Sequence, residues 1–173
     1  PLWNFRRLNL ALDRICAPDG FAFAPRRITI STSGWTPGIR RLTRAGRQWH
    51  LALSLHATTD RLRAELIPEP RRRPLTEVLA ACREYRAQTG RIVTFEYLLL
   101  SGINDRPADA LALARLARQE RAKINLIPFN PIPGLPYSRP DRETIRRFAA
   151  TLAEHGATAT LRREMGTDIQ AAC

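Results

Sequence analysis

The sequence predicts an α/β fold with a parallel sheet. Strand-like and helix-like patterns alternate along the 173 residues, and strands that are separated by helices imply right-handed crossovers and parallel pairing. About five strand–helix units are visible, which is too few for a complete eight-fold barrel. Polar residues follow several of the strands, at the edge where parallel α/β folds bind their ligands.

Short stretches rich in β-branched or apolar residues predict the strands. In order they are "RRITIS" (26–31), "HLALSL" (50–55), "RIVTFEYLLL" (91–100), "AKINLIPF" (122–129) and "ATATLR" (157–162), of which the last has the weakest pattern.

Between and before the strands, apolar residues recur at helical spacing in residues 2–16, 74–90, 107–119 and 142–156. Their apolar stripes include Phe5, Leu8, Leu12 and Ile15, then Val78, Leu79, Cys82 and Tyr85, then Ile145, Phe148, Ala149 and Leu152. Pro74 suits a first helical turn, Gly90 a helix end and Asp105 an N-cap.

The chain is strongly basic, with a net charge of +12 and, apart from Lys123, only arginine as its basic residue. A balance of this kind indicates a polyanionic partner such as nucleic acid. Arginines scattered over solvated helix faces would give the same total. The basic loop at residues 69–75 is open to the same two interpretations, a solvated connector or a phosphate contact.

Cys16, Cys82 and Cys173 are an odd number of cysteines at wide spacing, which argues against a disulfide framework or a zinc site and favours a reducing cytoplasm. We expect Cys16 and Cys82 to be core residues, whereas Cys173 follows a polar stretch and is a candidate reactive thiol. No apolar run reaches the ~20 residues of a membrane span. The chain begins at Pro1 and its single methionine is Met165, so we expect a fragment of a longer protein.

Three predicted strands end in neutral polar residues: "STSG" from Ser31, "SLH" from Ser54 and "PFNP" around Asn130. Hydroxyl, imidazole and amide groups at one sheet edge suit a polar small molecule with an amino-acid moiety better than a metal. Each has a simpler alternative: a serine of "STSG" as N-cap of the helix after Pro37, His56 as a loop histidine bonded to backbone, and Asn130 as a turn residue. Glu96 lies inside a strand pattern, where we expect a core or supporting role.

The sequence resembles a known family in several of these motifs. "RRITISTSG", "LALSLHATTDRLRAELIP", "KINLIPFNPIPGLPY" and "RREMGTDIQAAC" are similar to the radical-SAM RNA methyltransferases that methylate adenine at carbon 2 in large-subunit rRNA and, in some bacteria, in tRNA. The motifs follow the family order from Arg26 to Cys173. Pro1 and Leu2 resemble the end of the family's Gly-Glu-Pro-Leu motif.

The resemblance implies that residues 1–173 form a single partial domain, the C-terminal part of a partial parallel (β/α) barrel of the radical-SAM type. It implies that S-adenosylmethionine is contacted by Ser31, Ser54, Leu55, His56 and Asn130. It also implies that Cys173 is methylated to S-methylcysteine by one S-adenosylmethionine. A second molecule, cleaved at a [4Fe-4S] cluster, gives a radical that takes hydrogen from this methyl group, and the methylene radical then attacks the adenine. The implied partners are rRNA, in some bacteria also tRNA, and an external electron donor of the flavodoxin type.

The three-cysteine motif that holds the cluster in this family is absent from the chain, and neither Cys16 nor Cys82 matches it. We therefore expect the chain alone to hold no cluster and to be inactive. Two alternatives stay open at this point. One is the sister activity that methylates adenine at carbon 8 of rRNA and gives antibiotic resistance, and the other is a non-catalytic RNA-binding paralogue.

Overall fold

A computed structural model describes residues 1–68 and 73–162. The fold class is α/β, and the five strands form a parallel sheet in the order β1-β2-β3-β4-β5, which confirms the predicted class. Most of the basic loop (69–72) and the segment that contains Cys173 lie outside the described residues.

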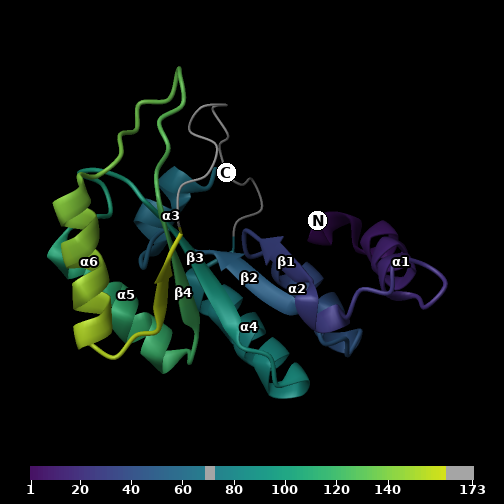
Figure 1. Cartoon of the computed structure of the whole chain (residues 1–173). Coiled ribbons are helices and arrows are strands. Elements are labelled where there is room, and N and C mark those ends of the chain that lie inside the picture. Colours follow the sequence, from purple (N-terminus) through teal and green to yellow (C-terminus); the bar gives the residue numbers. More distant parts are fainter. Residues whose placement is uncertain (69–72, 163–173) are drawn as a thin grey trace. The chain divides into compact units, whose positions relative to one another are not determined.

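In chain order the elements are the 3₁₀ helix η1 (Leu2–Asn4), α1 (Phe5–Cys16), the 3₁₀ helix η2 (Pro25–Arg27), β1 (Thr29–Thr32), α2 (Thr36–Arg44), β2 (His50–Ser54), α3 (Asp60–Leu66), α4 (Leu75–Thr89), β3 (Val93–Leu99), α5 (Pro107–Gln119), β4 (Lys123–Pro128), α6 (Arg142–Glu154) and β5 (Ala159–Leu161). Figure 1 shows these elements along the chain.

The chain divides into two compact units, which are described separately. The first comprises Pro1–Ser54 and Ile67–Thr94, and the second comprises Leu55–Leu66 and Phe95–Cys173. A single domain over residues 1–173 stays a prediction.

In the first unit, β1 and β2 pair in parallel, with Ser31 opposite Ala52. Leu51 and Leu53 of β2 are completely buried, as expected for a strand covered on both faces. Helix α4 is anchored to the start of β2, because the hydroxyl of the buried Tyr85 donates a hydrogen bond of 2.6 Å to the carbonyl of Trp49.

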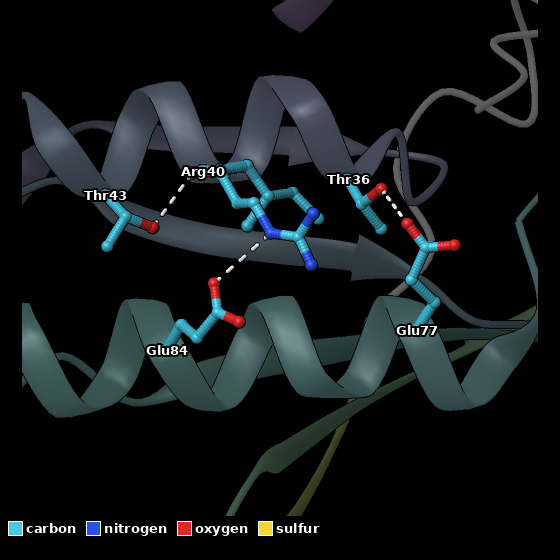
Figure 2. A network of polar contacts seen from close by, with 6 residues as sticks. Thr36, Arg40, Thr43, Glu77 and Glu84 are labelled. Carbon is cyan, nitrogen blue, oxygen red and sulfur yellow. Dashed lines mark hydrogen bonds and ion pairs between the residues drawn. The ribbon is translucent and has the colours of Figure 1, made fainter.

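Helices α2 and α4 of the same unit pack side by side and are joined by polar contacts (Figure 2). The hydroxyl of Thr36 donates a hydrogen bond of 2.6 Å to the carboxylate of Glu77. In the middle of α2, about one turn after Thr36, the guanidinium of Arg40 lies 3.4 Å from the carboxylate of Glu84. These contacts fix the register of the two helices where α2 begins, directly after β1.

In the second unit, β4 and β5 pair in parallel, with Asn125 opposite Thr160. Strand β3 alternates strictly: Phe95, Tyr97 and Leu99 are buried, whereas the residues between them are half-buried. The ring of Tyr97 stacks on that of Phe148 in α6, with 5.7 Å between centroids. Helices α5 and α6 pack against each other in this unit (Figure 1).

The main helices lie where the sequence predicts them, and Gly90 ends α4 in the left-handed conformation with a φ of +68°. Two details differ. The short helix α3 was not predicted, because its charged sequence has no clear apolar stripe. The N-cap of α5 is Arg106 rather than Asp105, because the Asp105 carboxylate instead accepts the N–H of Gly102 at 2.9 Å.

None of the helices in the described part of the chain is long and apolar enough to cross a membrane.

Candidate functional site

The first unit presents two of the predicted site residues at the carboxyl ends of neighbouring strands. Ser31 is exposed and pairs with Ala52, so the two side chains lie on the same face of the sheet. Ser54 is two residues beyond Ala52 and, by strand alternation, also lies on this face. The N-cap of α2 is Trp35, which makes no side-chain capping hydrogen bond, so neither Ser31 nor Ser33 of "STSG" is the N-cap. The proposed N-cap role of "STSG" is therefore wrong.

In the second unit, the chain turns sharply at His56. The φ of His56 is +56°, and the N–H of Ala57 donates a 2.8 Å hydrogen bond to the carbonyl of Leu55, which closes a γ-turn. Both Leu55 and His56 direct their N–H groups to the carbonyl of Glu96, at 3.0 and 3.3 Å. Leu55 is completely buried. A residue other than glycine with positive φ costs about 1–3 kcal/mol and is typical of ligand sites.

The imidazole of His56 is held in one orientation and one protonation state. Its Nδ1 accepts a 3.1 Å hydrogen bond from the N–H of Leu98. Burial, reinforced by the charge of Arg63, lowers the pKa of His56 to about 4, against a small opposing effect of Glu96. Because Nδ1 accepts a hydrogen bond, the neutral ring carries its proton on Nε2. The alternative interpretation of His56 as a backbone-bonded histidine is thus confirmed for Nδ1, and Nε2–H is the donor of the neutral ring.

A buried amide that the sequence analysis missed holds this turn. Asn104 is completely inaccessible to solvent. Its Nδ2 donates hydrogen bonds to the carbonyls of His56 (2.9 Å) and Leu98 (2.7 Å), while its Oδ1 accepts the N–H of Leu100 at 2.7 Å. The side chain therefore ties the His56 turn to the end of β3. In the sequence, "GIND" is indistinguishable from an ordinary turn, because the signal lies in distant hydrogen bonds.

Asn130, the third predicted strand-end residue, follows β4 in the second unit. Its Oδ1 accepts a 3.2 Å hydrogen bond from Nη1 of Arg139, and partial burial, with a smaller effect of Arg142, lowers the pKa of Arg139. No other hydrogen bond to Asn130 occurs in the described residues, so its amide N–H₂ stays available to donate. Arg139 thus orients the amide with its donor side away from the guanidinium.

Glu96 supports the neighbouring strands, as predicted. Its carboxylate accepts a 2.7 Å hydrogen bond from Nδ2 of Asn125 in β4. Burial raises the pKa of Glu96, against smaller opposing effects of Asn125 and Arg162. The carboxylate belongs to the half-buried face of β3, opposite to the buried side chains Phe95 and Tyr97.

The described cysteines do not fit an iron–sulfur cluster. Cys82 is buried in α4 as predicted, and Cys16 is only partly buried at the end of α1. Within residues 1–68 and 73–162, no group of three or more His, Cys, Asp or Glu side chains is arranged to hold a metal ion. Cluster ligation by thiolates therefore finds no support in these residues. Cys173 lies outside the described part.

The chain is similar to several known proteins. It is 50% identical over 174 residues to the "Probable dual-specificity RNA methyltransferase RlmN" of Symbiobacterium thermophilum, and 49% identical over 173 residues to the "Dual-specificity RNA methyltransferase RlmN" of Anaeromyxobacter dehalogenans. The whole chain is covered in both alignments, but only 47% and 46% of the relatives. The chain therefore spans about half the length of these relatives. No family model matches it.

A solved structure agrees with these relatives. The crystal structure of a radical SAM methyltransferase from Sphaerobacter thermophilus superposes with a TM-score of 0.94 and 47% identity, over 100% of this chain and 51% of that one. Over its full length, the chain is thus similar to radical SAM RNA methyltransferases, as its motifs predicted.

Proposed function

We propose that this chain is the S-adenosylmethionine-binding part of a radical SAM methyltransferase that methylates carbon 2 of an adenine in large-subunit rRNA, with tRNA as a second substrate in some members of the family. The observation that carries the proposal is about 50% identity over the entire chain to proteins named as dual-specificity RNA methyltransferases. The positive charge of +12 supports an RNA substrate, because phosphates dominate the affinity of proteins for nucleic acids.

The cofactor contacts that we propose are Ser31, Ser54, Leu55, His56 and Asn130. They are supported by their place at or directly after carboxyl strand ends, where parallel α/β folds bind ligands. Leu55 would contribute its carbonyl oxygen, because its side chain is buried and its N–H is bonded to Glu96. S-adenosylmethionine supplies the methyl group when it is bound.

The role of His56 is to donate one directed hydrogen bond. Its ring stays neutral down to a pH of about 4, and a neutral donor places no second positive charge near a sulfonium. Asn130, whose N–H₂ is turned away from Arg139, is the second donor of this kind. Both groups suit the hydroxyl and carboxylate oxygens of an amino-acid nucleoside.

Two further roles are part of the proposal. Cys173 is the residue that carries the methyl group as S-methylcysteine. The reducing electrons come from an external donor of the flavodoxin type. The [4Fe-4S] ligands belong, in this proposal, to the half of the relatives' length that this chain does not span.

The test uses a chimaera in which this chain replaces the matching part of the Symbiobacterium relative. The chimaera, reconstituted anaerobically, should transfer a labelled methyl group from S-adenosylmethionine to 23S rRNA. His56→Ala should raise the Kd for S-adenosylmethionine about tenfold, since one hydrogen bond to a charged group is worth about 1.5 kcal/mol. His155→Ala is the matched control, because His155 is exposed near the end of α6. Equal Kd values for the two variants would contradict the assignment of His56.

A further inference from the structure

Two indole rings in the first unit form a stacked pair at the surface. Trp3 of η1 and Trp35 lie with their ring centroids 4.7 Å apart and their planes 8° from parallel. The guanidinium of Arg41 lies 5.7 Å from the centroid of Trp35, within the range of a cation–π contact. Trp3 is 49% exposed, so a large part of this indole remains open to solvent.

Local packing fixes the pair in place. A β-carbon at Gly38 in α2 would lie 2.5 Å from Cε3 of Trp35 and 2.6 Å from Cβ of Leu2. Only glycine leaves room for both residues to approach the helix. Leu2, which precedes Trp3, is 2% exposed and anchors η1 there. The stacked pair is therefore held in its geometry before any partner binds, which lowers the entropic cost of binding.

The charged residues that lie nearest the pair in the sequence are all arginines. Arg6 and Arg7 follow Trp3 by about one turn, and Arg44 follows Arg41 by three residues. All of these are exposed, and no acidic residue lies in the first turn of η1, α1 or α2. Within the described residues, Arg6, Arg7 and Arg44 form no ion pair. An aromatic surface bordered by unpaired arginines suits an anionic, base-bearing polymer better than a protein interface, whose core is depleted of charge.

The position of the pair agrees with such a role. Trp35 lies just beyond the carboxyl end of β1, four residues after the exposed Ser31. In this unit, the stacked indoles therefore lie at the carboxyl end of a strand, which is where parallel sheets bind their ligands.

We propose that the Trp3–Trp35 pair is a stacking platform for an unpaired base of the RNA substrate, with the adjacent phosphates bound by Arg6 and Arg7. The inference rests on the proposed function and adds to it the surface that holds single-stranded RNA. Stacking on an aromatic ring and charge-assisted contacts to phosphates are the two interactions by which proteins hold unpaired RNA.

The test is a fluorescence titration of the 173-residue chain with an adenosine decamer, A10, at fixed salt. Binding should quench indole emission, and Trp3→Ala should weaken the affinity about tenfold. Trp3→Phe should recover most of the affinity, because a phenyl ring still stacks. Leu10→Ala is the matched control: Leu10 is 62% exposed on α1, and its removal should leave the affinity unchanged. Circular dichroism of each variant verifies its fold.

The electrostatic part is tested separately. Removing both Arg6 and Arg7 should lower the slope of log K against log salt by about 1.4, which is the value for two phosphate contacts to a single strand. Inorganic tripolyphosphate, which has charge but no base, should bind wild type and Trp3→Ala equally. If Trp3→Ala bound tripolyphosphate more weakly than wild type does, the proposal that Trp3 acts by stacking on a base would be contradicted.

Equal A10 affinity of Trp3→Ala and Leu10→Ala would overturn the platform. The platform would also be overturned if A10 could not reach Trp3 in the chimaera, since another protein segment would then cover the indole. If the chimaera methylates RNA and Trp3→Ala binds A10 as well as wild type does, the platform alone is refuted. If A10 binding depends on Trp3 but the chimaera does not methylate RNA, the proposed methylation alone is refuted.

Discussion

Replacing Asn104 by alanine removes the three side-chain hydrogen bonds that hold the His56 turn against β3. At 0.5–1.5 kcal/mol for each bond, and with buried backbone partners left unsatisfied, the free energy of unfolding should fall by about 3 kcal/mol. For a chain of this length, the melting temperature should fall by roughly 6–12 °C. This loss of free energy is large because the amide is completely buried, so water cannot replace its hydrogen bonds to the backbone carbonyls.

The assay is urea unfolding, together with amide hydrogen exchange at Leu100, whose N–H donates to Asn104. Leu100 should exchange faster in Asn104→Ala than in wild type. The matched control is Asn9→Ala in α1, where the amide makes one hydrogen bond to Asp13 and alanine favours the helix. Its stability should change by less than about 0.5 kcal/mol. Equal stabilities of the two variants, with Leu100 still protected, would refute the clamp.

Three further predictions concern stability. The lowered pKa of His56, about 4, means that between pH 6.5 and 4 the unfolded chain binds a proton that the folded chain excludes. Wild type should therefore lose about 3 kcal/mol more than His56→Gln as the pH falls through this window; parallel urea profiles would contradict this. Tyr85→Phe removes the bond to the Trp49 carbonyl and should cost about 1–2 kcal/mol in urea unfolding, whereas an unchanged midpoint would exclude that bond as a stabilising contact. Gly90→Ala should cost about 1 kcal/mol by thermal unfolding, because φ is +68° while the surrounding space is open; an equally stable variant would count against backbone strain.

The sequence predicted those strands and helices in which the buried residues recur at a regular spacing. The alternation of β3 and the apolar face of α4 around Cys82 and Tyr85 appear directly in the structure, since each buried position recurs every second residue or every three to four residues. Helix α3 was missed because its seven residues are mostly charged or exposed.

The candidate site could be predicted only in part. His56 and Asn130 were found because they follow strands, which is a local signal. Asn104 contacts His56 across 48 residues of sequence, and the orientation of Asn130 depends on Arg139. Hydrogen bonds between distant segments leave no periodicity, so these supporting residues emerge only from the folded chain.

The proposed function depends most on the chemistry that this chain supports when joined to the rest of a methyltransferase. The direct measurement is mass spectrometry of nucleosides from unmodified 23S rRNA after incubation with the chimaera. We predict 2-methyladenosine, with much less of it from the His56→Ala variant than from His155→Ala. The appearance of 8-methyladenosine instead, or the absence of methylated adenosine while the intact Symbiobacterium relative is active, would contradict the proposal.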